Sequence, residues 1–291
     1  MNRTLLVGVD GSPESRAAVT WAAAEAARRG TELRISHVQT WSDDARSAPG
    51  APGGVRGLTE QLLDETAAEV RRAHPGLTVR AELLVGGDPA DLLVRSAEQA
   101  GALVLGSRGL GGFAGLVVGS VGLAVAARCE RPTVLVRASS SETTGGHQKG
   151  EVVVGVDSHA PSSVTLEFAF RQADLLGAKL RAVHGWELPA AWSYSGWVPP
   201  HETWEKLGNI ELERLDTAVN PVRDRYPDVP VILDARAGTA AGAVVEASRD
   251  AAALVVVGRR RRPHPVGMRL GPAAHAVLHH AYAPVAVVPH D

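Results

Sequence analysis

The sequence predicts an α/β fold made of two tandem doubly wound domains, each a parallel sheet with helices on both faces. Three observations lead to this prediction. The chain contains one sequence twice, and each copy alternates short apolar runs with longer segments of helical spacing. Its 291 residues are 45% hydrophobic and 21% charged, which suits two ordinary globular domains. Largely apolar strands separated by helices are typical of a parallel sheet that is buried on both faces.

The duplication is visible in matching segments. The tetrapeptide Val-Gly-Val-Asp at 7–10 recurs at 154–157, which is 147 positions later, and His37 and His184 keep that offset. Further along the chain the offset becomes 152, so the second copy carries five additional residues after His184. The pairs at the second offset are Pro75 with Pro227, Gly86 with Gly238, Gly106 with Gly258, Gly119 with Gly271, and Pro132 with Pro284. A period of this length indicates a duplicated domain rather than a solenoid of short repeats.

We predict domains over residues 1–138 and 150–291, because the segment 139–149 between them is polar and contains glycine, as linkers do. Helix starts are predicted at Ser12 and Asp88, since each is an N-cap residue type followed by proline. The apolar runs that predict strands in the first copy are Leu5–Val9, Leu33–Val38, Val79–Val85, Leu103–Leu105 and Thr133–Val136.

The loop after Leu105 is the most informative segment for function. In folds of this class, ligands bind beyond the carboxyl ends of the strands. This loop carries six glycines between positions 106 and 119, and glycine lets a ligand approach the backbone closely. The pair Gly119-Ser120 then opens a helix, whose free N–H groups and positive dipole end suit a phosphate. The residues alone leave two interpretations open: a phosphate site, or a flexible glycine loop with Ser120 as an ordinary N-cap.

At this point the sequence resembles the universal stress protein family, over nearly the whole chain and as a tandem-domain member. The ATP-binding members carry Gly-x2-Gly-x9-Gly-Ser, which Gly106, Gly109, Gly119 and Ser120 match. They also have an aspartate at the end of the first strand, as Asp10 is here. The resemblance implies a Rossmann-like, five-stranded parallel sheet of order 3-2-1-4-5 in each copy. That order would bring Asp10 opposite Gly106.

The resemblance also implies an adenine nucleotide site, with a role for each matching residue. The backbone of Gly8 and Val9 and the carboxylate of Asp10 would hold adenine and ribose. Val38 would line the adenine pocket. The residues that would surround the phosphates are Gly106, Ser107, Arg108, Gly109, Gly119, Ser120 and Val121. Two alternatives stay open: Asp10 as a turn residue that leads into the first helix, and Arg108 as a solvated loop charge.

The second copy departs from this pattern. Arg261 stands in place of the second glycine, and Pro272 stands in place of the serine, which removes a hydroxyl and an N–H donor. Gly185 replaces Val38 at the adenine wall. We therefore predict that the second copy does not bind ATP as the first does. The run Arg259–Arg262 is interpreted as a solvated surface loop, with attraction of another polyanion as the alternative.

Composition argues against several function classes. The formal net charge of -2 shows no basic excess for nucleic acid, and the apolar runs are too short to cross a bilayer. The N-terminus shows no signal-peptide cleavage site, and a single cysteine, Cys129, excludes an internal disulfide. We therefore expect a cytoplasmic protein. We also expect no metal site, since the adjacent His279 and His280 do not face one another on a helix. The tryptophan-rich segment 186–204 is interpreted as a lid, a partner surface or a cleft filler.

The function expected is regulatory binding of ATP, with or without magnesium, and interaction with a protein partner that the sequence does not identify. No Gly-x4-Gly-Lys-Ser/Thr loop is present and no base is placed to activate water, so at most weak hydrolysis is expected. One alternative is a slow Mg-dependent ATPase that uses Asp10 or Asp88, and another is an interaction module without nucleotide. The fifth strands would be sheet edges, and such edges invite pairing. Members of the family that the sequence resembles commonly pair through this strand, so the resemblance implies a pseudo-dimer of the two copies. A homodimer of whole chains is compatible with the sequence.

Overall fold

The protein is described here as a computed structural model. It describes residues 4–40, 54–109, 118–138, 150–188, 200–249, 252–261 and 270–291. The chain divides into two compact units, unit 1 over Met1–Gly146 and unit 2 over His147–Asp291. The predicted linker at 139–149 lies outside the described residues, so the predicted domain boundaries stay a prediction.

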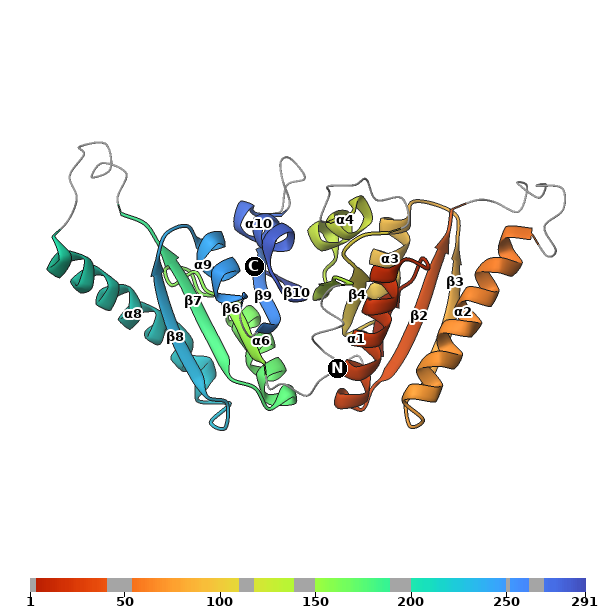
Figure 1. Ribbon diagram of the computed structural model, residues 1–291, viewed down its shortest axis with the longest axis horizontal. Coiled ribbons are helices and arrows are strands. Elements are labelled where there is room, and N and C mark those ends of the chain that lie inside the picture. Colours follow the sequence, from red (N-terminus) through yellow and green to blue (C-terminus); the bar gives the residue numbers. More distant parts are fainter. Residues whose placement is uncertain are drawn as a thin grey trace. The chain divides into compact units, whose positions relative to one another are not determined.

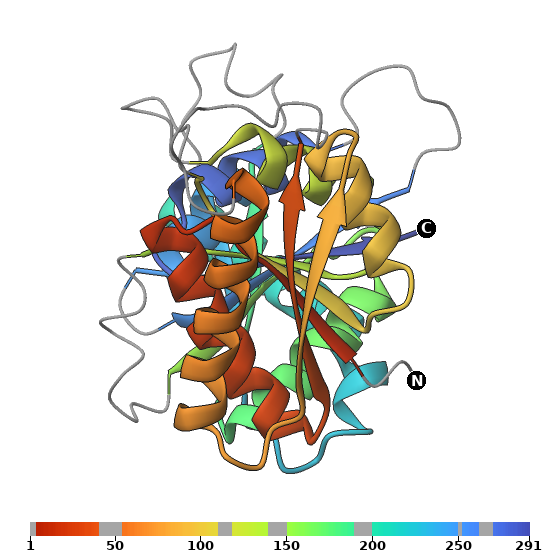
Figure 2. The ribbon, with the colours of Figure 1, turned by 90° about the vertical axis from the view of Figure 1, so that its right-hand side faces the viewer.

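Unit 1 alternates strands and helices in the order that the sequence predicts. Its elements are β1 (Thr4–Gly8), α1 (Pro13–Arg29), β2 (Glu32–Gln39), α2 (Gly54–Ala73), β3 (Val79–Val85), α3 (Pro89–Ala97), β4 (Ala102–Gly106), α4 (Ser120–Arg128) and β5 (Thr133–Val136). The strands are all parallel and lie in the order β3-β2-β1-β4-β5. Helices α1 and α2 cover one face of this sheet, and α3 and α4 cover the other (Figures 1 and 2).

Unit 2 repeats this architecture. Its elements are β6 (Glu151–Gly155), α6 (Ser163–Leu176), β7 (Leu180–Trp186), α8 (His201–Arg223), β8 (Val231–Ala237), α9 (Ala240–Ala247), β9 (Ala252–Arg260), α10 (Pro272–His280) and β10 (Val285–His290). The strand order is β8-β7-β6-β9-β10, again with parallel neighbours. The predicted fold class and the order 3-2-1-4-5 are therefore confirmed in both units.

The local signals that fix the helix ends act as the sequence predicts. The Ser12 hydroxyl caps α1 by accepting a hydrogen bond from the Ser15 N–H at 3.1 Å. Asp88 caps α3 in the same way, and Gly30 ends α1 in the left-handed region at a φ of 58°. The central strands β1, β4, β6 and β9 form the most deeply buried part of each core. No described helix is long and apolar enough to span a membrane.

Candidate functional site

A cavity of about 950 Å³ opens at the carboxyl ends of β1 and β4 in unit 1. These two strands are neighbours, and the chain leaves them in opposite directions, from β1 to β2 and from β4 to β5. Such a switch point leaves a crevice in which doubly wound folds bind their ligands. All eleven predicted site residues line the cavity: Gly8, Val9, Asp10, Val38, Gly106, Ser107, Arg108, Gly109, Gly119, Ser120 and Val121.

Asp10 has the turn role that the sequence left open, and it also lines the cavity. Its Oδ1 accepts a hydrogen bond from the Ser12 N–H at 3.0 Å, so the carboxylate shapes the turn into α1. Its Oδ2 faces the glycine loop, because a Cβ placed on Gly109 would lie 2.5 Å from that oxygen. Only glycine therefore lets the loop backbone pass this close to the carboxylate.

Packing alone requires a glycine at position 106. A Cβ at this position would lie 2.7 Å from the carbonyl carbon of Glu14 and 2.8 Å from the Ser15 nitrogen. Both are backbone atoms of the first turn of α1, which therefore lies directly against the end of β4. The sequence assigned Gly106 to phosphate contact, and the structure adds this second reason for a glycine.

The N-terminus of α4 opens onto the cavity. Its N-cap is Gly119, which has no side chain to cap the helix, and no other described residue is seen to cap it, whereas α1 and α3 are capped by Ser12 and Asp88. Ser120 is the first helical residue, so the interpretation of Ser120 as the N-cap is wrong. The Gly119 N–H is bonded to the Ser107 carbonyl at 2.7 Å. The remaining N–H groups of the first turn form a positive end without a capping side chain, which is a suitable partner for an anion.

Arg108 is an exposed loop charge, but it is also ion-paired. Its Nε donates to Glu14 Oε1 at 2.9 Å, and its Nη2 lies 2.7 Å from the same oxygen, while the Glu14 side chain is buried. This ion pair fixes the loop against α1. Burial lowers the pKa of the nearby Arg137 guanidinium, and repulsion from Arg108 lowers it further. Two guanidinium groups therefore lie close together at this edge of the sheet.

Sequence reasoning missed part of the cavity wall. His37 lines the cavity, and its Nδ1 lies 2.7 Å from the Val9 carbonyl, so the ring donates there. The strand-end rule that selected Val38 could have selected His37 as well. The other lining residues that were not predicted are Ser15, Ser36, Thr40, Pro89, Leu93, Leu105 and Gly122. Leu93 and Leu105 make part of the wall apolar, as a flat base requires.

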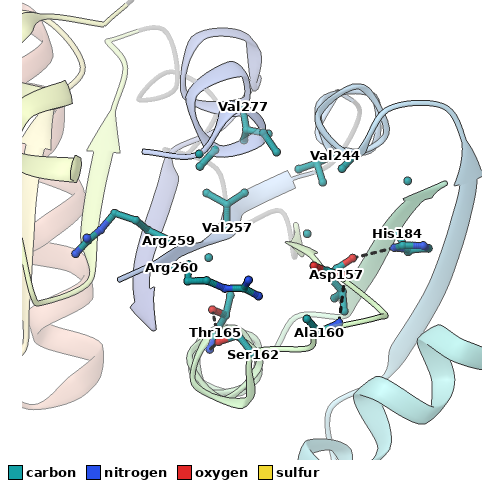
Figure 3. Close-up of a pocket in the computed structure, with 18 of the residues that line it drawn as sticks. Asp157, Ala160, Ser162, Thr165, His184, Val244, Val257, Arg259, Arg260 and Val277 are labelled. Atoms are coloured by element: carbon teal, nitrogen blue, oxygen red, sulfur yellow. Dashed lines mark hydrogen bonds between the residues drawn. The ribbon is translucent and has the colours of Figure 1, made fainter. Parts of the chain in front are cut away.

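The equivalent cavity in unit 2 is smaller, at about 580 Å³, and is built differently (Figure 3). Strand β9 does not stop at Gly258 but continues to Arg260, because β10 pairs with it up to His290. The Arg261 N–H also donates to the His290 carbonyl at 2.6 Å. The surface-loop interpretation is therefore wrong for Arg259 and Arg260: both lie in a strand, and Arg259 is buried.

The wall that Val38 forms in unit 1 is absent from unit 2. A Cβ on Gly185 would lie 2.6 Å from the Ala240 Cα, so the start of α9 takes the place of a side chain there. Helix α10 begins with Pro272, which lacks an N–H. In Figure 3 the side chains of Val244, Val257 and Val277 lie on the opposite side of the hollow from Asp157. These differences agree with the prediction that unit 2 does not bind ATP as unit 1 does, which stays a prediction.

Two of the four tryptophans in the segment 186–204 are described. Trp186 at the end of β7 and Trp204 in α8 pack with ring centroids 5.3 Å apart, so this pair fills space between strand and helix. Trp192 and Trp197 lie outside the described residues. A lid or partner role for the segment stays untested.

Fold and site together define the class: a duplicated doubly wound α/β protein with a glycine-rich ligand crevice. Residues 1–137 and 150–289 match the model of the universal stress protein family, and the chain belongs to this family. Universal stress protein Rv2005c of Mycobacterium tuberculosis is 33% identical, over 97% of this chain and 96% of its own. Universal stress protein Rv1996 of the same organism is 30% identical, over 100% and 96%.

A solved structure with the same fold covers the whole chain. A universal stress protein from Archaeoglobus fulgidus matches with a TM-score of 0.69 and 16% identity, and the match covers all of both chains. A universal stress protein crystallised in complex with cAMP is 30% identical over 47% of this chain and 98% of its own, with a TM-score of 0.36.

Proposed function

We propose that unit 1 binds one adenine nucleotide per chain, with ATP as the ligand, and that unit 2 does not. The observation that carries this proposal is the cavity between Asp10 and the uncapped N-terminus of α4. A carboxylate suits ribose hydroxyls because it accepts their hydrogen bonds, and a free helix N-terminus suits phosphate. The motif from Gly106 to Ser120 and the membership in the universal stress protein family support the same ligand.

We expect binding without fast turnover, as in a regulatory protein of the stress response. Among the described residues that line the cavity, none is a lysine and the one carboxylate is Asp10, whose Oδ1 is bonded to the Ser12 N–H. Efficient phosphoryl transfer needs a positioned base or water-orienting group in addition to charge stabilisation. Occupancy of the site would then change the interaction of this protein with a protein partner. A separate part of the proposal is that the two units pair through β5 and β10.

The test is a calorimetric titration of nucleotide-free protein with ATP and magnesium. One site per chain is expected, and Gly119→Val should weaken it at least about tenfold, because the new side chain occupies the phosphate position. A Cβ at Gly119 has its closest protein contact at 3.6 Å, so the substitution fits the fold.

The matched control is Gly271→Val in unit 2, where a Cβ meets nothing within 4 Å. This variant should bind ATP as the parent does. Two sites per chain would show that unit 2 binds nucleotide despite Arg261 and Pro272. No binding at all would leave the interaction module as the remaining function.

A further inference from the structure

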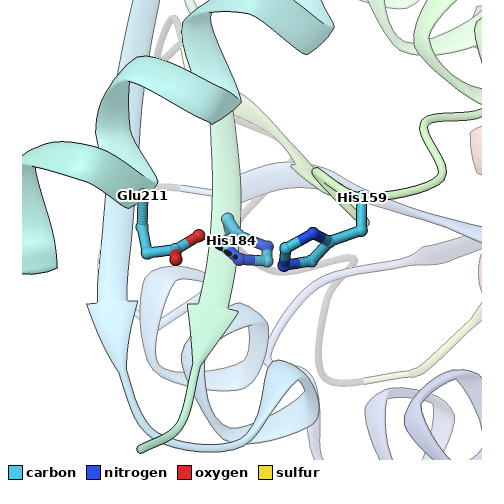
Figure 4. Close-up of side chains that lie close together, drawn as sticks. All are labelled: His159, His184 and Glu211. Atoms are coloured by element: carbon cyan, nitrogen blue, oxygen red, sulfur yellow. Dashed lines mark ion pairs between the residues drawn. The ribbon is translucent and has the colours of Figure 1, made fainter.

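We propose that unit 2 holds a Zn²⁺ ion with His159, His184 and Glu211. One ligand atom from each side chain lies within 4.8 Å of the other two. Figure 4 shows the His184 ring between the Glu211 carboxylate and the His159 ring. The three residues come from the loop after β6, from β7 and from α8, so only the folded unit brings them together. The expectation from the sequence that there is no metal site was based on His279 and His280, which are not part of this cluster.

His184 is oriented as a metal ligand. Its Nδ1 lies 3.0 Å from the Val156 carbonyl, which only accepts, so Nδ1 carries the proton and Nε2 presents a lone pair. Metal-binding histidines usually donate their second ring N–H in this way. The Ser158 hydroxyl, 3.2 Å from Nε2, is the group that a metal would displace.

Glu211 supplies a buried carboxylate that faces the same point. Its Oε1 is held by Arg214 Nη1 at 2.6 Å, and its Oε2 lies 3.5 Å from His184 Nε2. Within the described residues this Oε2 is buried and accepts no hydrogen bond. Zinc–ligand bonds of about 2.0–2.1 Å place tetrahedral neighbours about 3.3 Å apart, so this pair already has the right separation. The Arg214 charge opposes the metal but also fixes the carboxylate.

His159 completes the set from a loop that unit 1 lacks. Asp157 Oδ1 accepts hydrogen bonds from the N–H groups of His159 and Ala160, at 3.1 and 3.2 Å, and so holds this loop. The His159 side chain is exposed and lines the cavity of unit 2, which provides a route for the ion. The ligand atoms of the three side chains lie at most 4.8 Å apart, whereas neighbouring ligand atoms around a tetrahedral zinc ion lie about 3.3 Å apart. The His159 side chain therefore has to move by at most about 1.5 Å, which an exposed side chain can do.

Unit 1 provides an internal comparison. His37 matches His184 and makes the same bond to a strand carbonyl, at 2.7 Å from Val9. The residue at the position of Glu211 is Thr59, by the offset of 152. Both copies therefore have a histidine whose Nδ1 is bonded to a strand carbonyl, but only unit 2 has a carboxylate at the position of Glu211. Two imidazoles and one carboxylate are a typical zinc set, and they leave a fourth position for water or a ligand.

The test is titration of chelator-treated, nucleotide-free protein with Zn²⁺ in a calorimeter, and with Co²⁺ followed by visible absorption. One tight site per chain and a tetrahedral cobalt spectrum are expected. His159→Gln and Glu211→Gln should each weaken zinc binding more than about 100-fold, because loss of a contact that only supports a ligand already costs about 10–100-fold. Zinc should also raise the melting temperature of the parent protein and not that of Glu211→Gln.

The matched control is His275→Gln. His275 and His279 lie one helical turn apart on α10, with ring centroids 4.6 Å apart, and such a pair can itself hold zinc. This control should keep the tight site. The proposal is overturned if His159→Gln and Glu211→Gln bind zinc like the parent, or if His275→Gln alone removes the site. The result does not depend on nucleotide binding by unit 1.

Discussion

The two units share a strand order but differ in where the fourth strand stops. In unit 1, β4 ends at Gly106 and the next residues, 107–109, line the cavity, whereas β9 of unit 2 continues as a strand to Arg260. The extension is stabilised by β10, which pairs with β9 up to His290. The comparison shows that the replacement of Gly109 by Arg261 goes together with a different path of the backbone after the fourth strand. The change in the motif is therefore more than the loss of one glycine beside the aspartate.

The comparison extends to the aspartate after the first strand of each unit. Asp10 shapes a two-residue turn into α1 and leaves Oδ2 against the glycine loop. Asp157 holds a longer loop, and α6 begins only at Ser163. The same side chain thus forms part of the cavity wall in unit 1 and holds the loop that carries His159 in unit 2.

The largest expected effect is on stability, and it compares two equivalent glycines. Gly106→Ala should destabilise the protein by about 3 kcal/mol, because its Cβ meets the backbone of Glu14 and Ser15 at 2.7–2.8 Å. Gly258→Ala should cost less than about 1 kcal/mol, since its closest contact is the tip of the His290 ring, which can move. Urea unfolding of both variants measures the difference, and equal costs would contradict it.

A smaller effect is expected on nucleotide affinity. Gly109→Ala should weaken ATP about tenfold, or about 1.4 kcal/mol, because its Cβ would lie 2.5 Å from Asp10 Oδ2 and displace the loop or the carboxylate. The reverse change, Arg261→Gly, should not create a second site, because the Arg261 N–H remains bonded to the His290 carbonyl. Calorimetry with ATP tests both variants. A second site in Arg261→Gly would show that the Arg261 side chain alone prevents ATP binding in unit 2.

The smallest effect concerns a charge pair that both copies share across their second and third strands. Arg34 Nε lies 3.3 Å from Glu82 in unit 1, and Arg181 Nη1 lies 3.1 Å from Asp234 in unit 2. In unit 2, Arg236 also donates to Asp234 at 2.7 Å. Burial favours the neutral carboxyl, but the hydrogen bonds from Arg236 and Arg181 outweigh it and hold the pKa of Asp234 below its usual value.

Asp234→Asn should therefore destabilise the protein by about 1 kcal/mol at pH 7, and Glu82→Gln by less. A carboxyl with a lowered pKa in the folded state stabilises above its unfolded pKa of about 3.9, and this contribution is lost as the pH falls through the folded value. The cost of Asp234→Asn should thus shrink as the pH falls below the unfolded pKa and disappear once the pH is below the lowered pKa of the folded state. Thermal unfolding at several pH values checks this, and a cost independent of pH would assign the effect to packing.

Much of the fold could be predicted from the sequence, because apolar runs and caps act locally. The runs at Val79–Val85 and Thr133–Val136 coincide with β3 and β5, and Ser12 and Asp88 cap the helices that they were predicted to start. Eleven of the cavity-lining residues of unit 1 could also be predicted, because the family motif and the strand ends point to them, whereas His37 and the apolar wall were missed. The role of these eleven residues in nucleotide binding stays a prediction.

Long-range contacts could not be predicted in this way. The ion pair of Arg108 with Glu14 and the extension of β9 each depend on an element far away in the chain. The same holds for His159, His184 and Glu211, which are separated by up to 52 positions and share no spacing motif. Only packing of α8 against the sheet brings this carboxylate to the histidines.

The contact of Gly185 with Ala240 limits how the second copy can change. Any side chain at 185 would meet backbone of α9, so a point mutation there cannot rebuild the wall that Val38 forms in the first copy. Restoring it would require the start of α9 to move as well. In a duplicated gene, such a change is difficult to reverse, because it needs two coordinated changes and not one. The two copies are therefore under different structural constraints, and the second copy can evolve a different function.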